Sequence, residues 1–265
     1  MPARARHGAS GARYDRRVND LPGDSQKALK RARDKRVSYA VEILRTPDGR
    51  TLAILGEAHM KLAEAAEIGR AVVSTFALRG VETFQRDKVF CGRALGVVIQ
   101  APRTLLQILM LGRLKGSTIT DAKQLPDGWT VELERAKKMP FGLHVTALYM
   151  TVFFTVSFMA LLIPLIAPFV PWLAALIAGV AIAFQAHMLM LIPAFFFRRQ
   201  TWSWLLHPFL GILTLRDHLM VDGTVRMFAD HPRQRTAVVV MGRAHVSGYS
   251  TILVEKHGYT RVTEW

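Results

Sequence analysis

The sequence predicts an α/β fold, a mostly parallel sheet with flanking helices, that is interrupted by a two-helix transmembrane hairpin. Apolar runs near both ends of the chain have the length and composition of buried strands, and helical periodicity follows each of them. Between these regions, residues 141–197 hold no Asp, Glu, Lys or Arg. A long uncharged block inside an otherwise charged chain is typical of membrane spans.

Residues 1–36 predict a basic, disordered tail. They hold eleven Lys and Arg against four Asp and almost no large apolar residues, so they cannot bury a core of their own. The whole chain carries a net charge of +15, but basic residues beside a membrane more often contact anionic lipid than nucleic acid. No zinc-finger spacing or aromatic-interleaved basic patch accompanies them. We therefore expect the lipid bilayer, and no nucleic acid, as a partner.

Residues 37–140 form the first part of the predicted domain. Two β-rich runs, at 37–44 and 51–55, surround a turn and predict a hairpin. Helical spacing over 60–73 and a strand at 76–82 complete a strand–helix–strand unit, which predicts parallel pairing. A further strand is predicted at 129–133.

Residues 92–113 are mildly apolar but contain three arginines and a proline. These interruptions predict a pair of core or membrane-surface helices, broken at Pro102, rather than a full membrane span. The alternative, that the segment enters the bilayer, stays open at the level of sequence. Cys91, which directly precedes this segment, is the only cysteine, so the chain has no internal disulfide and no cysteine-based zinc cluster.

Residues 141–199 predict the hairpin, with spans near 144–166 and 172–196. The 57 uncharged residues would extend about 85 Å as one helix, whereas a bilayer core is about 30 Å thick. Three prolines lie where the connecting loop is needed. Basic pairs at 137–138 and 198–199 flank the hairpin, so the positive-inside rule predicts a soluble domain in the cytoplasm, at the inner membrane if the cell is bacterial.

Among the polar side chains in or beside the predicted spans are His144, Gln185 and His187. Intramembrane polar groups are functional candidates, but an interhelical hydrogen bond or an interfacial position is the role that we expect for them.

Residues 200–265 form the second part of the predicted domain. A helix is predicted over 215–229, and the unbroken apolar run at 236–241 is typical of a strand that a parallel sheet buries on both faces. A short helix to His257, a capping Gly258 and a last strand from Tyr259 follow.

The pattern Gly-x-x-His occurs twice, at Gly56–His59 and at Gly242–His245, each time after an apolar strand and before a helix. Glu82 ends another strand in the same orientation. Ligands of open α/β sheets bind beyond the carboxyl ends of the strands, so two imidazoles and a carboxylate are expected at one crevice. This set suits Zn²⁺, Mn²⁺ or Co²⁺.

Two further residues complete the predicted site. Glu57 is the candidate general base, and Arg216 is the candidate group for a substrate carboxylate or a developing oxyanion. For each residue a structural role is the alternative: His59 and His245 as helix caps, Glu82 as the partner of an arginine, and Arg216 as a solvated charge.

Four segments in this order resemble the TraB/PrgY–Tiki (GumN-like) superfamily, of which the chain looks like a divergent member. They are Leu-Gly-Glu-Ala-His-Met at 55–60, Gly-Val-Glu at 80–82, Leu-Arg-Asp-His-Leu-Met at 215–220 and Val-Val-Val-Met-Gly-Arg-Ala-His-Val-Ser-Gly-Tyr at 238–249. The resemblance implies a site of His59, Glu82, Arg216 and His245. It also implies either metal-dependent peptide cleavage or inhibition of peptide signalling. The inserted hairpin departs from the family pattern.

The first functional prediction is therefore a membrane-anchored, metal-dependent hydrolase, peptidase-like, in which His59 and His245 bind the metal and Glu82 is a ligand or base. The alternative is a non-catalytic membrane regulator that sequesters a signalling peptide or lipid in the same crevice. The sequence selects neither the metal nor the substrate.

Overall fold

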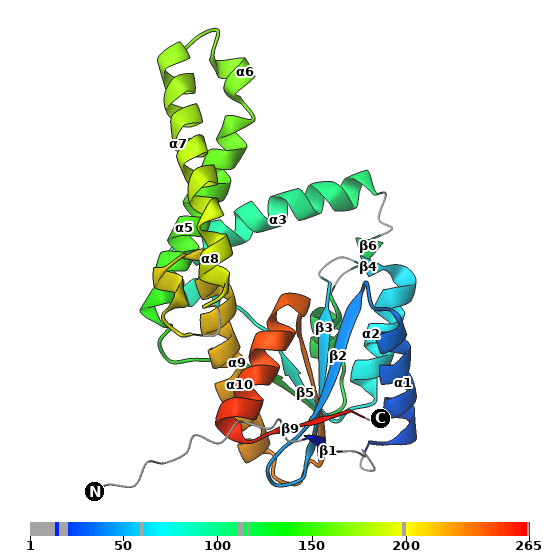
Figure 1. Ribbon diagram of the computed structural model, residues 1–265. Coiled ribbons are helices and arrows are strands. Elements are labelled where there is room, and N and C mark those ends of the chain that lie inside the picture. Colours follow the sequence, from blue (N-terminus) through cyan, green and yellow to red (C-terminus); the bar gives the residue numbers. More distant parts are fainter. Residues whose placement is uncertain are drawn as a thin grey trace, which may run out of the picture.

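The computed structural model describes residues 14–15, 21–58, 61–110, 114–115, 117–197, 200–263 and 265 (Figure 1). It has a central sheet with helices on both faces and a helical hairpin that projects from one end. In spatial order the strands of this sheet are β1 (Tyr14–Asp15), β9 (Thr260–Val262), β2 (Tyr39–Arg45), β3 (Thr51–Glu57), β8 (Thr236–Gly242), β5 (Leu78–Val81) and β7 (Trp129–Glu132). Two short strands, β4 (Lys61–Leu62) and β6 (Leu114–Lys115), pair separately.

The sheet is mixed, so the prediction of a mostly parallel sheet was wrong. Strands β3, β8, β5 and β7 are parallel to their neighbours within this group, whereas β2 is antiparallel to both β3 and β9. The predicted β2–β3 hairpin is confirmed, and a tight turn containing Gly49, at a φ of 85°, reverses the chain there. Strand β9 then adds to the outer edge of β2. The carboxyl ends of the parallel strands β3, β8 and β5 carry the predicted site residues.

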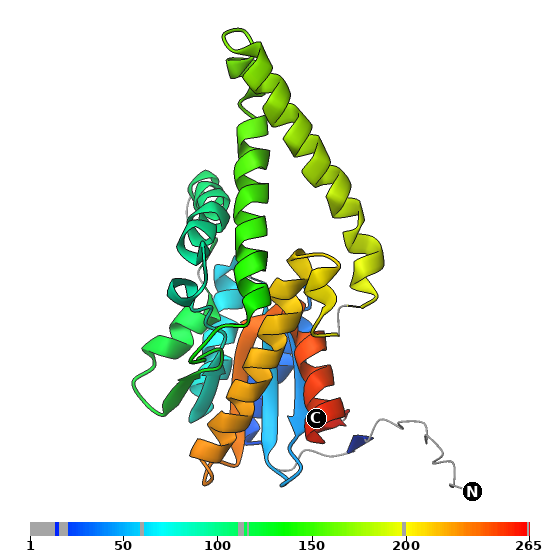
Figure 2. The same cartoon turned by 90° about the vertical axis from the view of Figure 1, so that its left-hand side faces the viewer.

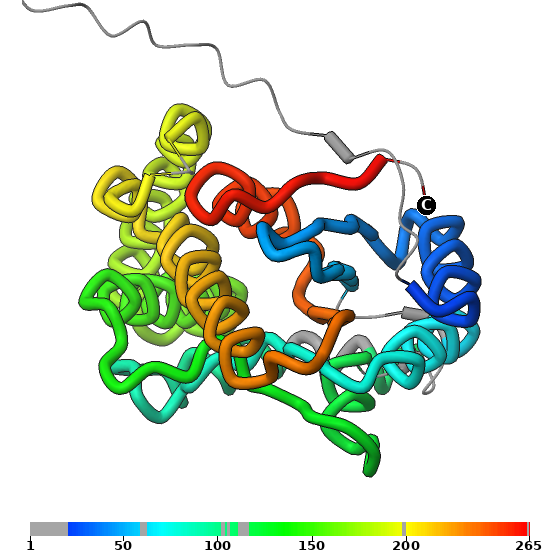
Figure 3. Tube along the Cα trace, turned by 90° about the horizontal axis from the view of Figure 1, so that it is seen from below, coloured from blue at the N-terminus to red at the C-terminus, as the bar shows by residue number. Residues whose placement is uncertain are grey.

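Alternating side chains of the central strands build a core on each face. On β8, Val238 and Val240 pack with helices α1, α2 and α4, while Val239 and Met241 pack with α9 and α10. Figure 3 shows α1 and α2 on one side of the sheet and α9 and α10 on the other. The bounds of these helices are α1 Gly23–Asp34, α2 Ala63–Ser74, α4 Thr118–Gln124, α9 Phe209–Asp230 and α10 Val246–His257.

Helix α1 corrects the prediction of a disordered tail over residues 1–36. Its buried residues, Ser25, Ala28, Leu29 and Ala32, recur at i, i+3, i+4 and i+7, so they form a narrow stripe that packs on the core. A stripe of mostly small residues buries little area per residue, which is why composition alone did not reveal it. The rest of the predicted tail, residues 1–13 and 16–20, lies outside the described residues.

One helix, α3 (Gly92–Leu109), replaces the predicted helix pair. It continues through Pro102, although a proline inside a helix removes one backbone hydrogen bond. The short helix η1 (Arg86–Lys88) precedes it.

The hairpin consists of α5 (Phe141–Ala160), α6 (Ile163–Ile166), α7 (Pro171–Leu189) and α8 (Leu191–Phe195). Two stretches, Phe141–Ala160 and Pro171–Phe195, are long and apolar enough to cross a membrane. Within the most apolar run of 18 residues in each stretch, only 22% and 6% are buried by the rest of the protein. Neither stretch is therefore a helix covered by the core. At 1.5 Å per residue, α5 is about 30 Å long, which matches a bilayer core.

Aromatic side chains mark both ends of this hairpin. Phe169 and Trp172 are exposed at its far end, while Phe141 contacts Trp204 near the domain. The helix η2 (Ser203–Leu205), which carries Trp204, leads from the hairpin into α9. Figure 2 shows how far α5 and α7 extend beyond the α/β domain.

The prediction of interhelical polar contacts is confirmed for His187, whose Nδ1 lies 2.5 Å from the Tyr149 hydroxyl of the other helix. The His187 ring also stacks on His207, with 4.6 Å between centroids. His144 instead accepts a hydrogen bond of 2.9 Å from the backbone N–H of Phe90, and Gln185 is exposed.

Candidate functional site

The carboxyl ends of three adjacent parallel strands meet at one edge of the sheet. Gly56 of β3 pairs with Met241 of β8, and Glu57 pairs with Gly242, so the two Gly-x-x-His motifs start side by side. On the other side of β8, the backbone N–H of Glu82 donates to the Val240 carbonyl at 2.9 Å. The predicted convergence of the three strand ends is therefore present in the fold.

Gly56 is needed for this close approach. A Cβ on Gly56 would overlap Cγ2 of Val246 and come within 3.2 Å of the Arg243 Cα. The first motif can thus lie against the loop of the second motif only with glycine at this position.

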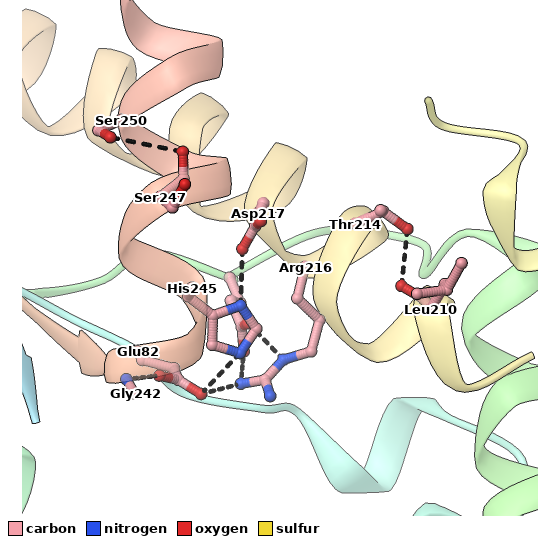
Figure 4. A network of polar contacts seen from close by, with 10 residues as sticks. Glu82, Leu210, Thr214, Arg216, Asp217, Gly242, His245, Ser247 and Ser250 are labelled. Atoms are coloured by element: carbon pink, nitrogen blue, oxygen red, sulfur yellow. Dashed lines mark hydrogen bonds and ion pairs between the residues drawn. The ribbon is translucent and has the colours of Figure 1, made fainter. Parts of the chain in front are cut away.

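The Glu82 carboxylate is buried and accepts hydrogen bonds on both oxygens. Oε2 accepts from the backbone N–H of Gly242, and Oε1 accepts from Nη2 of Arg216 at 2.6 Å (Figure 4). Glu82 therefore links the end of β5 to the second motif and to helix α9.

Arg216 lies between two buried glutamates. Its Nε donates to Oε1 of Glu134 at 2.6 Å and its Nη2 donates to Oε2 at 3.1 Å, in addition to the contact with Glu82. Glu134 follows β7 and is 1% exposed. Helix α9 comes this close because Gly223 lies directly against the Leu133 carbonyl, where a Cβ would clash. A two-armed guanidinium contact of this kind fixes both carboxylates in orientation.

The second histidine motif is held by an aspartate of the same helix α9. Nδ1 of His245 lies 2.6 Å from Oδ1 of Asp217, and both side chains are buried. The other ring nitrogen, Nε2, lies 3.7 Å from Oε1 of Glu82 (Figure 4). Gly248 leaves room for Asp217, since a Cβ there would overlap Oδ2. His245 is thus oriented by one carboxylate and directed at another.

Burial and the neighbouring charges shift the pKa values of Glu134, Asp217 and Arg216 in opposite directions. Burial raises the pKa of Glu134, and the adjacent Arg216 only partly opposes it. Burial also raises the pKa of Asp217, against the hydrogen bond to His245. Burial alone would lower the pKa of Arg216, but the Glu134 and Glu82 carboxylates raise it above its ordinary value.

These shifts predict that the free energy of unfolding falls as pH rises. A carboxyl with a raised pKa in the folded state stabilises the fold when it is protonated. This stabilisation is complete below the pKa of the unfolded chain, near 3.8 for Asp and 4.5 for Glu. It is lost as the pH rises through the pKa of the folded state. Thermal unfolding in detergent micelles from pH 4 upward measures this trend. Glu134→Gln, which cannot titrate, should flatten the slope, and an unchanged slope would contradict the assignment to Glu134.

Of the predicted site residues, Glu82, Arg216 and His245 come together, whereas Glu57 has a different partner. Its two oxygens accept from the Ser117 hydroxyl and, at 2.9 Å, from the Thr118 backbone N–H, so Glu57 caps the start of α4. It still lines the same pocket as the other three residues. His59 lies outside the described residues.

This pocket has a volume of about 700 Å³ and is lined by both polar and apolar residues. Among them are the polar site residues Glu82, Arg216 and His245 and the apolar Phe84, Leu95, Ile99 and Ile212. A second pocket of about 740 Å³ adjoins it at Glu82 and Phe84. The volume of the first pocket is that of an ordinary small-ligand or peptide-side-chain site.

The donor set can be tested against a divalent cation. The described residues, which do not include His59, contain no group of three or more His, Cys, Asp or Glu arranged to hold a metal ion. Two potential donors, Nε2 of His245 and Oε1 of Glu82, lie 3.7 Å apart, a spacing that one cation with bonds of about 2.1 Å can bridge. The three carboxylates of Glu82, Glu134 and Asp217 lie near a single guanidinium, that of Arg216. This excess of negative charge suits a cation.

Asp217 and Glu134 were not assigned a role from sequence. Glu134 follows a predicted strand just as Glu82 does, so the rule about strand ends could have found it. Asp217 lies beside Arg216 in a helix, and no local pattern indicates that its side chain turns toward the second motif. Comparison with protein-family models, curated proteins and solved structures gave no match, so the resemblance described above remains a prediction that rests on its motifs.

Proposed function

We propose that the chain is a membrane-anchored, metal-dependent hydrolase whose site consists of Glu82, Arg216, Asp217 and His245, with His59 as a further metal ligand. The observation that carries the proposal is the hydrogen bond between His245 and Asp217. A carboxylate that accepts from Nδ1–H fixes the tautomer in which Nε2 keeps its lone pair, and this nitrogen is directed at Glu82 beside the pocket.

Each side chain has a distinct role in this proposal. His245 and Glu82 would hold the metal, and Asp217 positions the His245 ring. A bound Mn²⁺, Co²⁺ or Zn²⁺ would supply an activated water and polarise a substrate carbonyl. Arg216 positions Glu82 and Glu134 through its hydrogen bonds to both carboxylates.

Peptides are the proposed substrate class, on the basis of the motif resemblance and the mixed lining of the pocket. Phe84, Leu95 and Ile99 can pack an apolar side chain, and a peptide carbonyl would have to reach Glu82 and His245 in the same pocket. We also infer that the two apolar helices cross a bilayer and that the domain faces the cytoplasm, because Lys137 and Lys138 are exposed at the start of α5.

Removal of metal tests the proposal directly. The full chain, reconstituted in lipid nanodiscs, should bind about one Mn²⁺, Co²⁺ or Zn²⁺ per chain as measured by mass spectrometry of the metal. It should cleave members of a quenched-fluorescent peptide library, lose this activity after dialysis against a chelator, and regain it when one of these ions is returned. Activity that survives chelation with no residual metal would contradict the proposal.

The sequestering regulator is the second candidate, and one observation favours it. Both Glu82 oxygens already accept hydrogen bonds, from Arg216 and Gly242, as they would in a purely structural network. If it is correct, the chain should bind peptides of the same library without cleaving them, and His245→Ala should leave this binding intact.

A further inference from the structure

Helix α3 carries an apolar surface that the described part of the chain does not cover. Val97 is 68% exposed, and Ile108 and Leu109 are each 66% exposed. The helix contains no Asp or Glu. Apolar residues concentrated on one uncovered helix indicate a contact surface.

The two sides of α3 have different neighbours. Leu95 and Ile99 line the pocket of the candidate site. At 3.6 residues per turn, the exposed residues Val97, Ala101 and Ile108 lie roughly 160° around the helix from this pair. Helix α3 therefore lines the first pocket with one side, whereas the exposed Val97, Ala101 and Ile108 lie on the other side, where Val97 also borders the second pocket.

This outer surface is at the level of the hairpin base. Figure 1 shows α3 running across the direction of α5 and α7, at the end of the domain from which they project, and Figure 2 shows it nearly end-on beside α5. Leu95 of α3 packs in one cluster with Leu143 of α5 and Leu215 of α9. The orientation of α3 relative to the apolar hairpin is thus set by core packing.

Exposed basic side chains lie near the start of α3, at the base of the hairpin. Arg86, Lys88 and Arg93 lie at the start of α3, and Lys88 donates to the Ala136 carbonyl at 2.7 Å, beside Lys137 and Lys138. Only Asp87, which pairs with Arg93 at 2.6 Å, opposes them in η1. A basic rim next to an apolar helix face is what anionic headgroups and the acyl boundary beneath them would contact.

We propose that α3 lies in the surface of the bilayer that holds the hairpin, and that the pocket beneath it receives its substrate from that surface. The bilayer contact follows from the exposed apolar residues of α3, its place at the base of the hairpin and the basic residues beside it. The origin of the substrate rests in addition on the proposed hydrolase function. A pocket covered by a membrane-surface helix favours peptides anchored in the bilayer over peptides free in water.

The position of α3 can be measured without any activity. Single cysteines at Val97, Ile108 and, on the distant helix α1, Lys27 are labelled with an environment-sensitive fluorophore in nanodiscs that contain anionic lipid. The background variant is Cys91→Gly, because Cys91 has a φ of 57°. Labels at Val97 and Ile108 should shift to the blue and be quenched by lipids with a nitroxide near the headgroup, whereas the label at Lys27 should not. Equal exposure of all three labels to water would overturn the proposal.

The origin of the substrate is tested with one cleavable library peptide, made with and without an N-terminal myristoyl chain and offered with anionic vesicles. Myristoylation should raise kcat/KM at least about tenfold, because the chain concentrates the peptide on the membrane. Val97→Asp with Ile108→Asp should remove this advantage without changing metal content, whereas Lys27→Asp should not. Equal rates for both peptides would overturn this part, and a chain that cleaves neither peptide would overturn the hydrolase while leaving the fluorescence result to decide the position of α3.

Discussion

Replacement of Arg216 by methionine is expected to lower the free energy of unfolding by about 3–5 kcal/mol, the usual effect of removing one partner from a buried ion pair. Arg216 holds Glu82 and Glu134 at 2.6 Å each, and both glutamates are almost fully buried. Methionine keeps most of the length of the side chain but leaves two carboxylates without a counter-charge. Denaturant or thermal unfolding in micelles at pH 7 measures the loss.

The pH dependence separates this electrostatic cause from loss of packing. Without Arg216, the raised folded-state pKa of Glu134 should rise further, so the variant should recover stability as pH falls toward the ordinary value of 4.5 for Glu. Arg216→Met combined with Glu134→Gln should recover part of the loss at pH 7. Arg226→Met on the same helix is the matched control, because Arg226 is exposed. A loss no larger than that of the control would show that the buried network contributes little.

Replacement of His245 by alanine is expected to abolish metal binding and hydrolysis while the protein remains in the membrane. Nε2 of this ring is the only imidazole nitrogen that the described residues place against Glu82. Metal content and peptide cleavage of purified variants give the measurement. His231→Ala, at the far end of α9, is the control with an equivalent loss of an imidazole. Equal metal content in His245→Ala and the parent protein would refute the assignment of this ligand.

Asp217→Asn tests the positioning role within the same experiment. An amide cannot accept from Nδ1–H with the strength of a carboxylate, and losses of about 10–100-fold in metal affinity are usual for such outer partners. Because the change preserves shape, stability should change far less than metal affinity. An effect on stability alone would show that Asp217 supports the fold and not the site.

The strands and the hairpin are the parts of this protein that local sequence predicts best. The run at 236–241 became β8 and is buried on both faces, and the turn around Gly49 defined the β2–β3 pair. The uncharged block became two long apolar helices, because its composition leaves few other structures. Each of these features depends on residues close together in the chain.

The pairing of strand β9 with β2 and the helix α1 were not predicted, because both depend on distant partners. Strand β9, near the end of the chain, pairs antiparallel with β2, and α1 is stabilised by contact with α2 rather than by a wide apolar face. The same limit applies to the capping role of Glu57, which depends on the position of α4 some sixty residues later.

By itself, the sequence determined that Glu82 and the two Gly-x-x-His motifs follow strands of like orientation and that an apolar hairpin separates the two halves of the domain. Only the tertiary structure decided that Asp217 orients His245, that Glu134 shares Arg216 with Glu82, and that α3 lines the pocket at the base of the hairpin. The physical reason is that strand polarity and apolar length are encoded over a few neighbouring residues. The partner of a buried charge is set by which helix packs over which strand end, and that arrangement involves the whole chain.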